Sequence, residues 1–353
     1  MDGPYARELA VAISAIQHAV KISSRVIASK NKGIVEKDDH SPVTVADLAI
    51  QALLTATIHS AFPDDLFVGE ESAEQLRASP TLLDAVWGLL SDLDIADSVA
   101  RIPASKDKLC SMLDWAGTGQ PSAGRYWIFD PIDGTKAFIR GENYAVNVCL
   151  MTGPGQTLSA VGIPLLAPDA VAPINNDTTS ASGSIMFATR GHGTFIRPLD
   201  GPADTPARRL PRRTADDTTQ LTAVTCVEGT DSAVPGLNVK IAARLGIAYP
   251  GNDLLAWVLR WAVLGLGAAD ATFWVYRKRT RYGKIWDHAG AMLLFEEAGG
   301  KITDVHGKVI DIFAGRAMSS NFGFVAALEG AHARVLSAVQ DAVREEGLLE
   351  LLV

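Results

Sequence analysis

The stretch YWIFDPIDGTKAF, residues 126–138, constrains this chain more than any other part of the sequence. Four apolar or aromatic residues run directly into Asp130 and Asp133, with a proline, a glycine and a threonine around them. Asp-Pro and Asp-Gly are turn-forming pairs, so a buried strand that ends in a turn is one interpretation. Two unpaired carboxylates there would repel each other and lose hydration unless cations held them. Since oxygen clusters of this kind bind Mg²⁺, a metal site is the other interpretation.

Three further acidic positions follow or begin apolar segments. Glu70, with Glu71, follows a short strand in FVGEES; Asp47 lies in SPVTVADLAI, and Asp287 lies in KIWDHAG. Each has an ordinary structural explanation, as a strand-to-loop junction, an acid in the first turn of a helix, or a helix N-cap. Capping does not exclude metal binding, because one carboxylate oxygen can accept from helix amides while the other meets a cation.

Helical and strand-like segments are mixed along the chain without strict alternation. Helical spacing predicts helices over residues 5–29, 46–62, 253–267 and 285–298, and several within 74–120. Strand-like runs occupy residues 67–68, 127–129, 145–151, 158–164, 184–189, 193–196, 221–229 and 271–276, and a strand and a helix close the chain. This order predicts an α+β fold, or a layered αβαβα fold, rather than a doubly wound sheet.

With 353 residues, the chain can form one enzyme-sized unit of two layered halves that share a cleft. We expect an N-terminal α+β half over residues 1–197, which carries most of the metal ligands. We expect a C-terminal α/β half over residues 221–353, which completes the metal and substrate site. Residues 198–220 are rich in Pro, Asp, Thr and Arg and lack periodicity, which predicts an exposed loop with its arginines in solvent.

The composition, 48% hydrophobic and 20% charged, is that of a globular protein. A net charge of −8 argues against binding to a nucleic acid polymer, which requires clustered cations. Cys110, Cys149 and Cys226 lack the spacing of a zinc site and are expected as reduced core thiols. The first residues carry charges through their apolar part and fit neither a signal peptide nor a membrane span, so a cytoplasmic protein is expected.

Together these motifs resemble the lithium-sensitive, magnesium-dependent inositol monophosphatase superfamily. Four segments carry the resemblance, and they are similar in particular to its 3′(2′),5′-bisphosphate nucleotidases, the PAP phosphatases of sulfur assimilation: SPVTVADLAIQ, FPDDLFVGEES, DPIDGTKAFIRGENYAV and IWDHAGAMLLFEEAGGKITD. The resemblance implies the inositol monophosphatase-like fold. It also implies hydrolysis of the 3′(2′)-phosphate of adenosine 3′,5′-bisphosphate (PAP), with PAPS as a further candidate substrate.

The family's site residues carry over to matching positions. The resemblance implies one Mg²⁺ held by Glu70, Asp130 and the carbonyl of Ile132, and a second held by Asp130, Asp133 and Asp287. A third, weaker ion would lie between Asp47 and Glu70. Asp47 and Thr135 would orient and deprotonate the attacking water. Gly134, Thr135 and Asp287 would contact the substrate, and Li⁺ would inhibit by replacing one Mg²⁺.

The likeness weakens where the nucleotide would bind. The family's histidine corresponds to Thr230 or Asp231. Its following serine and lysine have only Asn252, Asp253 and Arg260 as candidate stand-ins, and the arginine of its next strand has no clear counterpart in ATFWVYRKRT, the stretch around Trp274. The basic run at residues 277–284 is either a loop that meets a second phosphate or a solvated turn. An inositol polyphosphate 1-phosphatase, or a phosphatase for another small metabolite, is therefore the alternative. A lapsed enzyme that senses a phosphorylated ligand is a further alternative, although it has no need for so many mutually repelling acids.

Overall fold

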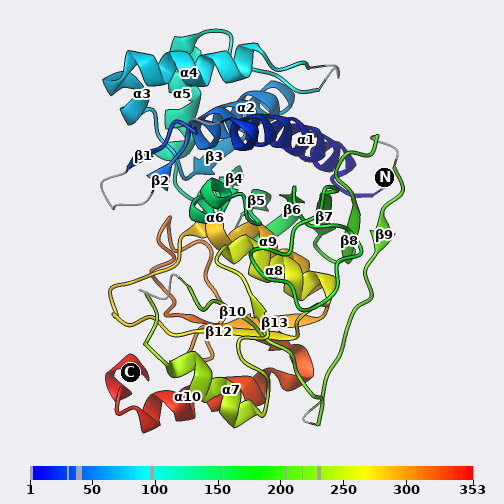
Figure 1. Cartoon of the computed structure of the whole chain (residues 1–353), viewed down its shortest axis with the longest axis vertical. Coiled ribbons are helices and arrows are strands. Elements are labelled where there is room, and N and C mark those ends of the chain that lie inside the picture. Colours follow the sequence, from blue (N-terminus) through cyan, green and yellow to red (C-terminus); the bar gives the residue numbers. More distant parts are fainter. Residues whose placement is uncertain are drawn as a thin grey trace.

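Helices and sheets alternate along the long axis of the molecule in five layers (Figure 1). The computed structural model describes residues 3–29, 32–36, 42–95, 99–153, 155–202, 205–216, 218–228 and 232–352. The first layer is formed by α1 (Ala6–Ala28) and α2 (Val45–Ala61), with α3 (Glu74–Ala78), α4 (Pro80–Ser91) and α5 (Lys106–Gly117) packed around them. The predicted α+β, layered αβαβα class is confirmed by this arrangement.

The second layer is a seven-stranded sheet in the order β3-β4-β5-β6-β7-β8-β9. Its strands are β3 (Leu66–Gly69), β4 (Arg125–Asp133), β5 (Ala145–Thr152), β6 (Gly155–Ile163), β7 (Ser184–Thr189), β8 (Thr194–Pro198) and β9 (Arg208–Arg209). β3 and β4 are parallel, and every other neighbouring pair is antiparallel.

The remaining layers come from the second part of the chain. The third consists of α8 (Trp257–Leu266) and α9 (Ile285–Glu297), which cover the other face of the large sheet. The fourth is the sheet of β12 (Ala271–Trp274), β14 (Phe324–Leu328) and β13 (Gly300–Thr303), beside the parallel pair β10 (Val224–Thr225) and β11 (Asn252–Asp253). α7 (Leu237–Leu245) and α10 (His332–Glu345) form the fifth layer. Short elements complete the fold: β1 (Val35–Glu36), β2 (Pro42–Val43), α6 (Thr135–Arg140), η2 (Glu329–Ala331) and η3 (Leu349–Leu352).

The apolar run before the aspartates is buried on both of its faces. Because side chains alternate along a strand, Tyr126 and Ile128 point into the core that includes α8 and α9. Trp127 and Phe129 point into the core that includes α1 and α2. All four side chains are inaccessible to solvent. A strand between two hydrophobic layers therefore needs an unbroken apolar sequence, which explains the run.

Three parts of the sequence prediction are corrected. β4 does not end at Phe129 but continues through Asp133, and its pairing with β5 shifts register between Asp130 and Asp133. The expected turn therefore comes later, at Gly134, and the proline, which has no N–H to donate, lies in an irregular part of the strand. The strand expected over residues 221–229 is the two-residue β10, and α7 was missed.

Residues 198–220 are not uniformly loop, because β9 pairs with β8 within them. Nor is Arg213 a solvated side chain. Its side chain is 20% exposed, and its guanidinium pairs with Asp270 at 2.7 Å and donates to the carbonyls of Leu264 at 2.9 Å and Ala269 at 2.8 Å. It therefore fastens this segment to the end of α8.

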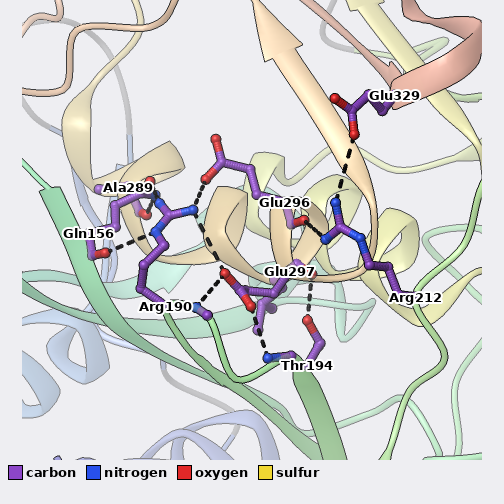
Figure 2. A network of polar contacts seen from close by, with 11 residues as sticks. Gln156, Arg190, Thr194, Arg212, Ala289, Glu296, Glu297 and Glu329 are labelled. Atoms are coloured by element: carbon purple, nitrogen blue, oxygen red, sulfur yellow. Dashed lines mark hydrogen bonds and ion pairs between the residues drawn. The ribbon is translucent and has the colours of Figure 1, made fainter. Parts of the chain in front are cut away.

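The C-terminal end of α9 is held to the large sheet by a polar network (Figure 2). Glu296 and Glu297 are unfavourable at this end, where the helix dipole is negative. Arg190, in the turn between β7 and β8, donates to Glu296 at 2.7 Å, and the amides of Gly191 and Gly193 donate to Glu297 at 2.9 and 2.8 Å. These donors offset the dipole and fix α9 against the sheet.

Cys110, Cys149 and Cys226 are free and buried, as expected. In the parts of the chain that the structure describes, no helix combines the length and the apolar character needed to span a membrane.

Candidate active site

Three carboxylates from two layers meet between the large sheet and α9. Oxygen atoms of Asp130, Asp133 and Asp287 lie within 4.8 Å of one another. Asp130 is 1% exposed and Asp133 is 6% exposed. The first two come from β4 and the third from the first turn of α9, 154 residues further along the chain. None of the three forms an ion pair with a described lysine, arginine or histidine.

The irregular end of β4 sets the direction of its two aspartates. The amide of Ile132 donates to Asp130 Oδ1 at 3.1 Å, which closes the backbone over that carboxylate. Asp133 Oδ2 accepts from the amide of Val258 at 2.6 Å, at the start of α8. Because the N-cap residue of α8, Ala256, has no capping side chain, Asp133 satisfies this helix start from the neighbouring layer.

Gly134 is required immediately after these aspartates. Its φ of +88° lies in the left-handed region, and a Cβ there would come within 2.8 Å of the Ala256 side chain. The glycine thus lets β4 approach the start of α8. It also precedes α6, so the main chain of Gly134 and Thr135 begins a helix of six residues beside the carboxylates.

Asp287 is oriented through the residue before it. Asn147 Nδ2 donates to the carbonyl of Trp286 at 2.7 Å, and Asn147 is paired with Asp130 in the β4–β5 register. A Cβ at Gly290, one turn into α9, would lie 2.1 Å from Asn147 Oδ1. The glycine allows α9 to lie directly on β5, and this close approach brings Asp287 to the sheet.

Glu70 follows the end of β3, and its backbone is fixed by Gln51 of α2. Gln51 Oε1 accepts from the amide of Glu71 at 2.8 Å, while its Nε2 donates to the carbonyl of Glu71 at 2.5 Å. The negative charge of Glu70 raises the pKa of Asp130, Asp133 and Asp287, so it lies within electrostatic range of all three.

Asp47 and Thr135 face each other across the junction of α2 and α6. Thr135 Oγ1 lies 3.3 Å from Asp47 Oδ1 and 3.2 Å from the carbonyl of Ile132. Asp47 Oδ2 accepts from the amide of Thr44 at 2.8 Å and from its hydroxyl at 2.6 Å. One carboxylate oxygen therefore caps α2, and the other faces Thr135.

Charge repulsion inside the cluster is large. Burial, followed by the charges of Glu70, Asp133 and Asp287, raises the pKa of Asp130 well above its usual range. Burial raises the pKa of Asp133 to about 7, although the Val258 amide and Arg260 act in the opposite direction. Buried acids at such distances are stabilised by a cation. The donors are all oxygen and come from rigid elements, which fits a hard divalent ion such as Mg²⁺.

Arg260, one of the candidate contacts for a nucleotide, is buried between two aromatic rings. Arg260 is 2% exposed and lies between Trp257 and Trp274, with its Cζ 4.2 and 4.8 Å from their ring centroids. Its Nε and Nη2 donate to the carbonyls of Leu254 and Leu255 at 2.8 and 3.0 Å. The ring of Trp274, on β12, is thus covered by a guanidinium from α8.

Burial and the charges of Asp133 and Glu70 raise the pKa of Asp287 well above its usual value, and in the basic run at residues 277–284 it is Lys284 whose charge partly offsets this rise. Arg279 lies over the ring of Phe322 at 5.1 Å. His288 packs within the aromatic cluster, and its Nδ1 accepts from Trp261 Nε1 at 3.1 Å, which places the proton of the neutral ring on Nε2. Thr230 and Asp231, the two positions that correspond to the family's histidine, lie outside the described residues.

Sequence reasoning missed Gln51, Asn147 and Arg316, which fix the backbone around the acids. Gln51 and Asn147 each stand alone as a polar residue in an apolar stretch, in AIQALL and AVNVCL, and this was a usable signal. Arg316 lies in a connecting segment without such a pattern.

Comparison with known proteins agrees with this geometry. The model of the inositol monophosphatase family matches residues 5–344. A 3′(2′),5′-bisphosphate nucleotidase of Emericella nidulans is 34% identical over 96% of this chain and 99% of its own length. One of Schizosaccharomyces pombe is 34% identical over 94% of each chain. The solved structure of a Thermotoga maritima IMPase has the same fold, with a TM-score of 0.60 and 18% identity over 96% of this chain and 99% of that one. The chain therefore belongs to the inositol monophosphatase family, as a phosphatase related to its bisphosphate nucleotidases.

Proposed function

We propose that this chain is a Mg²⁺-dependent phosphomonoesterase that converts PAP to AMP and phosphate, with PAPS as a further substrate. The observation that carries the proposal is the cluster of Asp130, Asp133 and Asp287, the first two of them buried, beside the facing pair Asp47 and Thr135. Full-length relatives that are named for this activity support the choice of substrate. Li⁺ inhibition, a cytoplasmic location and a place in sulfur assimilation belong to the same proposal.

In this proposal two Mg²⁺ ions would be held by Glu70, Asp130, the carbonyl of Ile132, Asp133 and Asp287, and a third, weaker ion would lie between Asp47 and Glu70. When bound, the ions would supply Lewis-acid activation of water and neutralisation of phosphoryl charge. The protein fixes the orientation of the carboxylates that would bind these ions. Asp130 and Asp133 are set by β4 and the start of α8, and Asp287 is set by Asn147 through Trp286.

In this proposal Asp47 and Thr135 take up the proton that the attacking water loses. Since Thr44 occupies Asp47 Oδ2, Oδ1 is the oxygen directed at the Thr135 hydroxyl. A water held by Thr135 Oγ1 can pass its proton to the hydroxyl as the hydroxyl proton passes to Asp47 Oδ1. The water oxygen then attacks phosphorus directly as the bond from phosphorus to the 3′-oxygen of the substrate breaks, and that oxygen takes a proton from solvent, so no phosphoenzyme forms. The amides of Gly134 and Thr135, with Asp287, contact the substrate.

Phosphate release tests this function. PAP, inositol 1,4-bisphosphate, inositol 1-phosphate and fructose 1,6-bisphosphate are each incubated with Mg²⁺, with Mg²⁺ plus Li⁺, and with chelator. We expect release from PAP to exceed the others, to stop without Mg²⁺ and to fall with Li⁺. Asp130→Ala should abolish release. Preference for an inositol phosphate would assign the chain to the alternative substrate class, and activity that persists in chelator would contradict the metal site.

A further inference from the structure

We propose that Arg316 is a positioning residue that sets the distance between Glu70 and Asp287, and so determines the affinity for Mg²⁺. Arg316 lies in the segment between β13 and β14, outside every element that carries an acid of the site. The inference rests on the proposed function, because it assumes that these acids hold a metal. What it adds is one side chain that joins the two separated parts of the cluster.

The guanidinium holds the backbone before Glu70. Arg316 Nη2 donates to the carbonyl of Gly69 at 2.7 Å, one residue before Glu70. Its Nη1 donates to the carbonyls of Ala116 at 3.2 Å and Gly119 at 3.0 Å, at the C-terminal end of α5. A cation is favourable there, because the end of a helix carries partial negative charge. Arg316 therefore joins the end of β3 to the end of α5.

The end of β3 and the end of α5 are packed too closely to move independently. A Cβ on Gly119 would lie 1.8 Å from the carbonyl oxygen of Phe67, and one on Gly117 would lie 2.3 Å from that of Glu71. The end of α5 therefore rests directly on the backbone on both sides of Glu70. Gln51 holds Glu71 from the other direction, as described above. A shift of Arg316 would accordingly move the main chain that carries the Glu70 carboxylate.

The same residue holds the backbone before Asp287. The Cζ of Arg316 lies 4.6 Å from the ring centroid of Trp286, one residue before Asp287. The carbonyl of Arg316 accepts from the amide of Ile285 at 3.0 Å, at the first residue of α9. Its side chain and its main chain thus both contact the start of the helix that supplies Asp287. Together with the Gly69 contact, this places Arg316 between the third layer and the large sheet.

Arginine suits this role better than lysine. A guanidinium is planar, so it can donate to three carbonyls in its plane while its face stacks on an aromatic ring. Lysine would keep the charge but not this combination of contacts. Partners that orient metal ligands typically change metal affinity by about 10–100-fold when they are lost. An arginine that merely stabilised the fold would instead change stability without a specific loss of metal affinity.

Arg213 provides a matched control. It also donates to main-chain carbonyls of two neighbouring positions, Leu264 and Ala269, and it also fastens a connecting segment to a helix end. Its segment is attached to the C-terminal end of α8, whereas Asp133 contacts the N-terminal end. Arg316→Met and Arg213→Met each remove donors to main-chain carbonyls, and Arg213→Met also removes the ion pair with Asp270. Only Arg316 lies next to the acids.

The experiment measures Mg²⁺ binding by titration calorimetry and Tm in chelator for the wild type, Arg316→Met, Arg316→Lys and Arg213→Met. We expect about a tenfold or greater loss of Mg²⁺ affinity in Arg316→Met and a smaller loss in Arg316→Lys. Arg213→Met should lower Tm but keep the wild-type affinity. Wild-type affinity in Arg316→Met, or in Arg316→Lys if the methionine variant does not fold, would overturn the inference. An equal loss in Arg213→Met would also overturn it. Failure of the wild type to bind Mg²⁺ would instead refute the proposed function, and this inference with it.

Discussion

Asp133 links the metal site to the stability of the protein. It is buried, its pKa is raised to about 7, and its Oδ2 accepts from Val258 at the start of α8. A carboxyl whose pKa is higher in the folded protein than in the unfolded chain binds its proton more tightly when folded. The metal-free protein should therefore lose stability as the pH rises from about 4, the usual value for aspartate, to about 7.

A bound cation removes that cost, because it favours the ionised form. We expect saturating Mg²⁺ to raise Tm more at about pH 8 than at about pH 5.5, where protons compete for the same oxygens. Asp133→Asn keeps an acceptor for the Val258 amide but removes the charge. It should raise the Tm of the metal-free protein at the higher pH and abolish most of the Mg²⁺ effect. Equal Mg²⁺ effects at the two pH values in the wild type would contradict this account.

Substitution of Thr135 should affect proton transfer but not metal binding. Its hydroxyl contacts Asp47 Oδ1 and the Ile132 carbonyl. Thr135→Ala should lower kcat by about 10²–10⁴-fold, the usual contribution of a positioned proton-transfer group. Mg²⁺ affinity should change little, since no carboxylate is lost. Thr135→Ser retains the hydroxyl and serves as the control for turnover. A serine variant as slow as the alanine variant would show that the hydroxyl is not the group that matters.

The acids could be predicted from the sequence because each lies beside a local pattern, such as a strand end or a helix start. Their supports could not, because their partners are far away along the chain. Arg316 and Gly69 are 247 residues apart, and Asn147 and Trp286 are 139 residues apart. These contacts are made to main-chain carbonyls, which leave no trace in the identity of the partner residue. The stacking of Arg260 on Trp274 was likewise out of reach, since it needs two neighbouring layers.

At the level of elements, the close approach of α9 to β5 is the feature that brings Asp287 to the sheet. Gly290 permits it, because a Cβ there would lie 2.1 Å from Asn147 Oδ1. Gly290→Ala should push Asn147 away from the Trp286 carbonyl. We expect it to cost about 1–3 kcal/mol, as overpacking in a buried region does, and to weaken Mg²⁺ binding.

Gly88, in the interior of α4, is the control for this substitution. A Cβ at Gly88 would meet no atom within 4 Å. Gly88→Ala should therefore stabilise the protein by about 0.5–1 kcal/mol, since alanine is the better helix former. Urea unfolding of the two variants measures both effects. A Gly290→Ala protein as stable as Gly88→Ala would show that α9 does not need this close contact.

The order of helices and strands could be read from periodicity, but the irregular end of β4 could not. The sequence indicated a turn after Phe129, because proline and glycine usually interrupt a strand. In the structure β5 continues to pair beyond the irregularity, at Asp133 and Ala145. Pairing with a neighbouring strand therefore overrode the local preference, and both aspartates remained on one rigid strand.

In the whole molecule, the two hydrophobic cores meet at the large sheet. Along β4, Tyr126 and Ile128 belong to one core, and Trp127 and Phe129 belong to the other. Loss of either core would therefore expose one whole apolar face of this strand, so both cores are needed to keep the strand out of water. The acidic cluster adds a second connection, since β4 supplies two carboxylates and α9 supplies the third. Residues 1–197 and 221–353, which we expected as two halves, should for this reason unfold together.

Differential scanning calorimetry tests this expectation. With Mg²⁺ we expect one transition whose calorimetric and van't Hoff enthalpies agree, and with chelator we expect one transition at a lower temperature. Both cores depend on the same strands, so loss of the metal should weaken the joint structure without dividing it. Two separate transitions in chelator would mean that the halves are independent units and that the cations, rather than the shared sheet, hold them together. In that case Asp130→Ala would also show two transitions, because it removes a carboxylate from the sheet side of the junction.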